Sequence, residues 1–268
     1  MQAHRPRFMI PRSFLLLATL GLVYLLICNP QPCSLAEYIM SSHLKPIKLY
    51  GAHGANPPKV AVILEELDLP FEIIHIPISD VKNPDYVALN PNGRLPTIQD
   101  PNLDITIWES GAIIEYLIER YDPEHKLSFP PGTIESYHAK QWLFFQVSGQ
   151  GPYFGQASWF KKFHHEKLPS AIDRYFREID RVNGVLESWL GQQKEKDLGG
   201  DGPWVVGGKL TFADLSFVAY HRAGTLGLPD DYSVEKFPLV KEWYGKMLAR
   251  ERTKSAIEKT SKASGMMR

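Results

Sequence analysis

Two short motifs, ten residues apart, combine residue types that can hold a charged ligand at the edge of a sheet. Residues 90–98 have the sequence NPNGRLPTI, and residues 108–113 have the sequence WESGAI. Pro96 heads a predicted strand, where it has no N–H for the ladder. A cis bond before Pro96 costs only about 0.5–1 kcal/mol and would leave the Leu95 backbone free to pair with a bound peptide. We expect Glu109 and Ser110 to hold a charged end of that peptide.

These motifs belong to a predicted α/β unit over residues 47–122. Strand-forming runs alternate with helical periodicity in the order β-α-β-α-β-β-α. Asn56, followed by two prolines, predicts a helix start with Asn56 as the capping residue. The strands are expected at 47–50, 71–76, 97–99 and 105–108, and the helices from 56 onward, at 80–89 and at 110–121.

A linker rich in Pro and Gly, residues 123–132, separates this unit from an all-helical second domain at 133–260 and a short tail at 261–268. Thr211 and Asp214 form a capping box, for which a structural role is the preferred interpretation. Helices are expected at 134–147, 158–165, 168–193, 212–226 and 237–251, with a break between the first two at residues 149–152.

The composition narrows the functional classes. The formal net charge of the 268 residues is zero, which gives no sign of a nucleic-acid partner. Cys28 and Cys33 are the only cysteines of the sequence. A disulfide, a zinc–thiolate site or a cysteine nucleophile is therefore excluded after residue 33. No metal site is predicted, because His164 and His165 have no partner ligands nearby in the sequence.

The first 46 residues differ from the rest. Basic residues precede a mostly apolar run at 14–28, as in a signal peptide or a signal anchor. The run is shorter than the roughly 20 residues that span a bilayer comfortably. Met40 is an alternative start, which would leave the extension without a structural role. We expect a cytoplasmic catalytic domain, either free or held at a membrane through residues 14–28, and we expect residues 1–39 to be dispensable for folding.

The ordered set of motifs resembles the cytosolic glutathione S-transferases, in particular the fungal branch related to the yeast nitrogen-catabolite regulator and the bacterial nu-class enzymes. The likeness covers about residues 47–255. The segments that carry it are 59–67 (KVAVILEEL), 90–96, 109–113, 151–157 (GPYFGQA), 160–164, 174–175 and 210–214 (LTFAD). The resemblance implies a thioredoxin-like N-terminal domain, a helical C-terminal domain, glutathione as cosubstrate and usually a homodimer.

The resemblance also implies roles for individual residues. Asn56 would contact the glutathione sulfur at a helix N-terminus, whose free N–H groups and dipole favour the thiolate. Glu109 would pair with the γ-glutamyl ammonium, and Ser110 would hold the γ-glutamyl carboxylate. Arg94, and with less support Lys82, would meet the glycyl carboxylate.

The electrophile pocket is expected in the helical domain, where aromatic residues are concentrated. Some of them are expected to face the cleft and the others to be core. The candidates are Tyr153, Phe154, Trp159, Phe160 and His164. The leading hypothesis is a glutathione transferase acting on small hydrophobic electrophiles, in detoxification or in the tailoring of a secondary metabolite. The alternative is a non-catalytic interaction or regulatory protein of the same fold.

Overall fold

The N-terminal domain is built on a mixed four-stranded sheet in the computed structural model, which describes residues 44–265. β1 (Ile47–Tyr50) runs parallel to β2 (Phe71–Ile74) and antiparallel to β3 (Thr97–Asp100), which pairs antiparallel with β4 (Ile105–Trp108). The strand order is β2-β1-β3-β4. The predicted α/β order and the thioredoxin-like sheet are confirmed.

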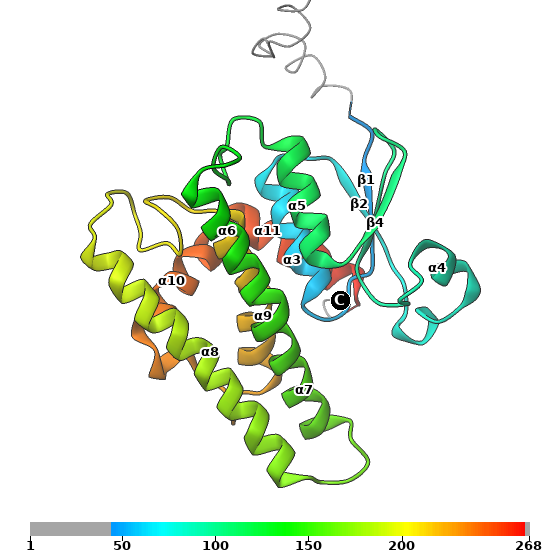
Figure 1. Cartoon of the computed structure of the whole chain (residues 1–268). Helices are drawn as coiled ribbons and strands as arrows, with labels where there is room; N and C mark the ends of the chain where they lie inside the picture. The colour runs from blue at the N-terminus through cyan, green and yellow to red at the C-terminus, as the bar shows by residue number, and fades with distance from the viewer. Residues whose placement is uncertain (1–43, 266–268) are drawn as a thin grey trace, which may run out of the picture. The chain divides into compact units, whose positions relative to one another are not determined.

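Three helices complete this domain. α3 (Asn56–Glu66) and α5 (Ser110–Tyr121) lie between the sheet and the C-terminal helices, whereas the short α4 (Pro84–Leu89), preceded by a 3₁₀ turn (Ile78–Asp80), lies on the opposite side (Figure 1). α3 is a core helix because all five residues from Val60 to Leu64 are fully buried. It therefore contacts the sheet, α5 and the C-terminal helices at the same time.

The C-terminal domain begins with a long helical segment rather than with two separate helices. α6 (Ile134–Phe145) continues through a π-helical turn, η2 (Gln146–Gln150), into α7 (Gly151–Lys162). This segment lies beside α8 (Pro169–Glu195) in Figure 1. The predicted break at residues 149–152 was wrong because the first turn of a helix tolerates Pro152, whose missing N–H is not needed there.

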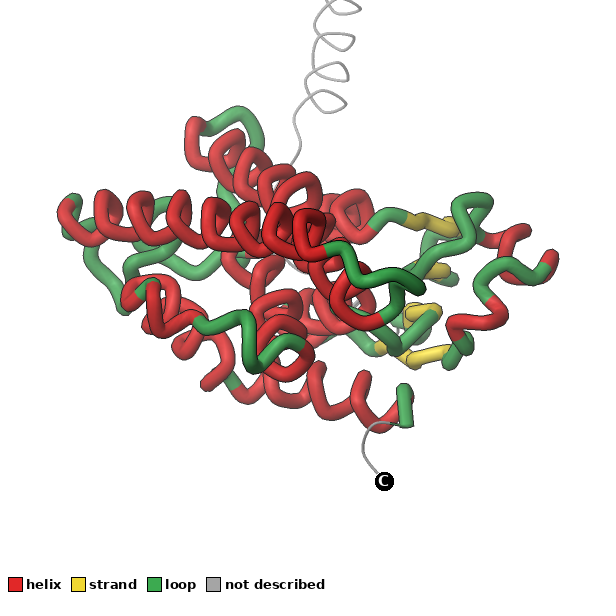
Figure 2. Tube along the Cα trace, turned by 90° about the horizontal axis from the view of Figure 1, so that it is seen from below, coloured by secondary structure: helices red, strands yellow, loops and turns green. Residues whose placement is uncertain are grey.

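The remaining helices lie against α3 and α8. α9 (Phe212–Gly227) is almost entirely buried, and α10 (Pro238–Ala249) follows a 3₁₀ turn (Val234–Lys236). α11 (Glu251–Ala263) packs along α3 and was not predicted as a separate helix. In Figure 2 the strands gather on one side, with α4 beyond them, away from the C-terminal helices.

The capping box at the start of α9 does more than cap that helix. Asp214 is fully buried and accepts the N–H and the hydroxyl of Thr211 at 2.9 and 2.8 Å. Its other oxygen accepts the Val205 N–H at 2.8 Å and the Trp243 indole N–H at 2.9 Å. The carboxylate therefore joins α9, α10 and the loop before α9, as the structural interpretation predicted.

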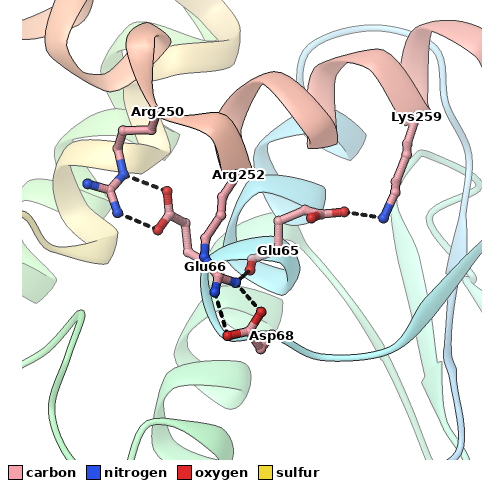
Figure 3. A network of polar contacts seen from close by, with 6 residues as sticks. All are labelled: Glu65, Glu66, Asp68, Arg250, Arg252 and Lys259. Atoms are coloured by element: carbon pink, nitrogen blue, oxygen red, sulfur yellow. Dashed lines mark hydrogen bonds and ion pairs between the residues drawn. The ribbon is translucent and has the colours of Figure 1, made fainter.

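A network of charged side chains joins the end of α3 to α11 (Figure 3). Arg250 donates from Nε and Nη2 to the two carboxylate oxygens of Glu66, at 2.6 and 2.7 Å. Arg252 bonds Asp68 and the Glu65 carbonyl, and Lys259 pairs with Glu65. The two domains are thereby fastened together on the side of α3 that faces α11.

The predicted apolar segment at residues 14–28 lies outside the described residues. Within residues 44–265, no helix is both long enough and apolar enough to cross a bilayer.

Candidate active site

A cleft of about 400 Å³ lies between the two domains. Its N-terminal-domain wall comes from the start of α3, the turn before β3 and the start of α5, and its C-terminal-domain wall comes from η2, α7 and α9. The side of the cleft formed by the N-terminal domain is lined by Asn56, Lys59, Asn90, Asn92, Arg94, Leu95, Pro96, Glu109 and Ser110. The predicted ligand-holding motifs are therefore brought together.

The turn before β3 is fixed by buried polar groups. The bond between Leu95 and Pro96 is cis, as the sequence predicts. The Asn90 amide donates to the Arg94 carbonyl at 2.7 Å and to the Thr97 hydroxyl at 3.0 Å. The Tyr86 hydroxyl donates to the same Arg94 carbonyl at 2.8 Å. These bonds hold the backbone of residues 94–97 against the cleft.

Glu109 and Ser110 meet the cleft at the junction of β4 and α5. Glu109 has a φ of 69°, a left-handed conformation that is costly for a residue with a side chain and persists where the surroundings enforce it. Its Oε1 accepts a hydrogen bond from the Asn92 amide at 3.3 Å. Ser110 is buried and is the first residue of α5, so the free N–H groups of that helix end favour an anion there.

Asn56 is in the first turn of α3 rather than at the capping position. Ala55 is the cap residue, and no side chain caps the helix, so the predicted capping role was wrong. The Asn56 Oδ1 instead accepts a hydrogen bond from the Ser110 hydroxyl at 3.3 Å. Burial raises the pKa of the Tyr220 phenol, and its hydrogen bond with Asn56 and the charge of Arg94 oppose that rise. Asn56 therefore connects the two helix starts at the floor of the cleft.

Lys59 is a cleft residue that the sequence analysis missed as a site residue. It lies one turn after Asn56 on α3, and only 1 % of its surface is exposed. Its ammonium donates to the Gln146 Oε1 at 2.7 Å. Burial lowers the pKa of Lys59 to about 7, although the charge of Glu109 raises it. The sequence did contain a signal, namely a lysine directly before a fully apolar helical run. A lysine next to such a run is a candidate for burial, and lysine is almost never fully buried unless it is paired.

The two basic residues expected at the glycyl carboxylate differ in position. Arg94 lines the cleft and is exposed. Lys82 is outside the lining, and its ammonium donates to the Asn92 carbonyl at 2.7 Å, where it supports the turn. The structure therefore brings Arg94, and not Lys82, to the cleft wall.

The five candidate aromatic residues of the electrophile pocket lie outside the lining of the cleft. Phe154 is 3 % exposed and packs with Tyr232 and Leu228, and Tyr153 packs against that cluster. Trp159, Phe160 and His164 contact one another near the other end of α7. The lining from the helical domain consists of Gln146, Val147, Gly151, Pro152, Gly155, Gln156 and Tyr220.

Helical periodicity explains this difference. Residues 151, 152, 155 and 156 share one face of α7, whereas Tyr153 and Phe160 lie on the face that meets Tyr175 of α8. The sequence analysis selected the aromatic residues by type and did not assign them to a face. Gly155 leaves open space on the cleft side of α7, since a Cβ there would meet nothing within 4 Å, whereas a Cβ at Gly151 would meet the Tyr220 ring at 3.4 Å.

Comparisons with known proteins agree on one family. Residues 49–125 match the model of the glutathione S-transferase N-terminal domain, and residues 158–260 match that of the C-terminal domain. The chain is 60 % identical over 209 residues to a glutathione S-transferase-like protein, tpcF, of Aspergillus fumigatus, with 77 % of this chain and 92 % of that protein covered. It is 55 % identical over 218 residues to another, gedE, of Aspergillus terreus, with 81 % and 96 % covered.

Solved structures give the same result. The glutathione transferase URE2P8 of Phanerochaete chrysosporium, crystallised with oxidized glutathione, matches with a TM-score of 0.75 and 42 % identity. The match covers 84 % of this chain and 99 % of that one.

Proposed function

The chain belongs to the glutathione S-transferase family, and from that premise we propose that it binds glutathione in the interdomain cleft and transfers its thiolate to a small electrophile. The observation that carries the proposal is the convergence of Glu109, Ser110 and the cis Leu95–Pro96 turn on one cleft with Asn56. Each of these groups matches a different part of a γ-glutamyl tripeptide.

The charged ends of glutathione match the polar groups of the N-terminal domain. The Glu109 carboxylate accepts hydrogen bonds from the γ-glutamyl ammonium, and the start of α5 at Ser110 binds the γ-glutamyl carboxylate. The Leu95 backbone pairs with the cysteinyl backbone as an added strand. Arg94, on the cleft wall, meets the glycyl carboxylate. These contacts bring the thiol to the start of α3, beside Asn56.

Catalysis on this proposal is the formation and positioning of a thiolate. A free thiol has a pKa of about 8.5, so only a few per cent is ionised at neutral pH. The start of α3 supplies unpaired N–H groups and a positive dipole end, and Asn56 supplies a side-chain amide. The thiolate then attacks an electrophile held by the helical domain.

The electrophile is proposed to bind along the cleft face of α7 rather than among the aromatic residues that the sequence suggested. Val147, Pro152 and Tyr220 supply apolar surface there, and Gly155 leaves open space beside it. Detoxification and secondary-metabolite tailoring both use this chemistry. The identity of neighbouring genes distinguishes the two roles.

The test is calorimetry with glutathione followed by turnover measurements on a panel of small electrophiles. We expect saturable binding of glutathione and conjugation of at least one electrophile. Glutathione binding with no turnover on any electrophile would favour the alternative, a non-catalytic interaction protein. Absence of glutathione binding would overturn the proposal.

Two further properties belong to this proposal. A homodimer is proposed because α6 exposes apolar side chains at Ile134, Tyr137 and Phe144, spaced to lie along one helical face.

A cytoplasmic catalytic domain is proposed because glutathione chemistry suits a reduced compartment, with membrane association through residues 14–28 as the finer hypothesis. Deletion of residues 1–39 should leave activity and melting temperature unchanged, and a change in either would assign that segment to the folded domain.

A further inference from the structure

Lys59 is a buried cation that opens onto the cleft. Its side chain is among the largest fully buried ones of the described residues, yet it lines the cavity beside Asn56, Ser110 and Gln146. Burying an ammonium is strongly unfavourable unless the charge is compensated. A neighbouring group must therefore compensate the charge of the Lys59 ammonium.

The neighbouring side chains supply only neutral acceptors by direct contact. The Lys59 ammonium donates to the Gln146 Oε1 at 2.7 Å, and the Gln146 amide donates to the Gln150 Oε1 at 3.0 Å. The Gln150 amide ends the chain at the Phe217 carbonyl, at 3.3 Å. An ammonium has three donors, and this is the one hydrogen bond of the Lys59 ammonium within residues 44–265. The other two N–H donors of the Lys59 ammonium are available to a group bound in the cleft.

A local distortion of the helical domain maintains this arrangement. Gln146 and Gln150 begin and end the π-helical turn between α6 and α7, and both are fully buried. Single π-helical turns inside α-helices are rare and occur frequently at functional sites. Here the turn presents Gln146 to Lys59 of the other domain, and Gln150 at its far end accepts a hydrogen bond from Gln146, although glutamine is mostly exposed in proteins.

We propose, resting on the proposed function, that the Lys59 side chain takes the proton of the bound glutathione thiol and remains beside the sulfur as its ammonium counterion. In this step the S–H bond breaks, both of its electrons stay on sulfur, and the proton forms an N–H bond on the Lys59 amine. Lys59 thereby becomes a catalytic residue together with Asn56.

The charges around Lys59 are consistent with this role. Burial brings the pKa of Lys59 to about 7, so near neutral pH a large fraction of the amine is free to accept a proton. Glu109 is the charged group that acts on it, and Arg94 and Tyr220 are the other titratable groups of the cleft wall. Arg250, which precedes α11, and Arg252 and Lys259 of α11 pair with carboxylates near the opposite end of α3.

The γ-glutamyl carboxylate and the thiol each lie at a helix start in the proposed complex, and Lys59 belongs to the helix that faces the thiol. The carboxylate has the start of α5 at Ser110. The thiolate has the start of α3, where Asn56 is a neutral amide and Lys59 follows three residues later on the same side of the helix. A charge at Lys59 therefore complements the anion that forms during the reaction.

The experiment compares the full-length chain with Lys59→Met, which keeps an unbranched side chain one atom shorter and removes the amine, and with the control Lys48→Met, which removes an exposed lysine of β1. The pKa of bound glutathione is measured by thiolate absorbance, with the S-methylglutathione complex as reference. We expect Lys59→Met to raise that pKa by about one unit or more. At a pH below the pKa, the ionised fraction of bound glutathione then falls about tenfold. Lys48→Met should leave it unchanged.

S-methylglutathione separates the thiol from the carboxylate, because it keeps the carboxylate and has no thiol proton. Equal affinity of Lys59→Met and the unaltered chain for this ligand is the expected result. A loss of affinity for S-methylglutathione as large as that for glutathione would place Lys59 at the carboxylate and overturn the proposal. An unchanged thiol pKa in Lys59→Met would also overturn it.

A measurement on the unaltered chain keeps the proposal testable even if Lys59→Met fails to fold. Calorimetry in buffers of different ionisation enthalpy counts the protons released on glutathione binding. At about pH 8, where Lys59 is mostly neutral, fewer protons should be released than thiolates formed, because the protein keeps the proton. Equal numbers would refute the proton transfer. If the unaltered chain bound no glutathione, the proposed function itself would fail, which is a distinct outcome.

Discussion

Glu109 combines a left-handed backbone with a carboxylate at the cleft wall. We expect Glu109→Gln to weaken glutathione binding about tenfold or more, because a charge-assisted hydrogen bond contributes roughly 1.5–3 kcal/mol. Calorimetry measures the change. Glu119→Gln, an exposed acid of α5 away from the cleft, is the control and should bind normally. An unchanged affinity in Glu109→Gln would remove Glu109 from the site.

Asn56 offers a clean test of function against stability, because its side chain does not cap α3. Asn56→Ala should raise the pKa of bound glutathione and slow conjugation. Its free energy of unfolding should change by less than the roughly 1 kcal/mol that a lost cap costs. A thiolate titration and a denaturant melt on the same sample give both values. A large loss of stability with an unchanged thiol pKa would make Asn56 a structural residue.

Lys59 should also be visible in the pH dependence of stability. Its pKa is about 7 in the fold and about 10.4 in an unfolded chain, so between these values the unfolded chain binds more protons. The free energy of unfolding of the unaltered chain should therefore rise with pH across this window. Lys59→Met should lack that rise. Denaturant melts at several pH values measure the difference, and parallel profiles for the two proteins would contradict the lowered pKa.

Residue type and local context were enough to predict Glu109, Ser110 and the cis bond before Pro96 as features of one cleft. They were not enough for Lys59, because its burial depends on Gln146, a residue 87 positions away in the chain. The aromatic candidates lie outside the lining of the cleft for a related reason. Which face of α7 meets the cleft is decided by its packing on α8, and composition does not encode that.

At the scale of elements, the α/β order could be predicted because each strand and helix has its own periodicity and its own turn residues. The continuity of α6 and α7 could not be predicted, since a sequence with Gly149 and Pro152 fits a loop as well as it fits a helix that tolerates these two residues. α11 was missed as a separate helix for the opposite reason. Its helical pattern continues that of α10, and the change of direction at Arg250 leaves no glycine or proline in the sequence.

Within the network between α3 and α11, the Arg250–Glu66 pair joins a partly exposed cation to a buried acid. The Glu66 side chain is 2 % exposed, and Arg250 binds it with two hydrogen bonds. Arg250→Ala should lower the free energy of unfolding by about 2 kcal/mol, because it leaves a buried carboxylate without its partner. Chemical denaturation measures this. Lys254→Ala, which breaks an exposed pair with Glu251, should cost less than about 0.5 kcal/mol. Equal effects of the two substitutions would contradict the argument.

At the scale of the whole molecule, the exposed apolar stripe of α6, formed by Ile134, Tyr137 and Phe144, predicts self-association. Tyr137 and Phe144 are 62 % and 58 % exposed. The double substitution Tyr137→Glu and Phe144→Glu should convert a dimer into a monomer in light scattering, because charges on both copies would be buried without partners. Phe163→Glu alters a 72 % exposed phenylalanine at the end of α7, off the stripe, and should leave the dimer intact. A monomeric unaltered chain would refute the predicted interface.

The π-helical turn at Gln146–Gln150 is, in effect, one surplus residue in a continuous helix. Each residue of an α-helix advances the direction of its side chains by about 100°. Deleting one residue within the turn would restore regular winding and leave the later positions of α7 facing as they do now, because the wider turn absorbs the surplus residue. The same deletion in a regular stretch of helix would rotate every later position by about that angle. The turn is therefore a place where the length of this segment can change while the glycines at 151 and 155 keep facing the cleft.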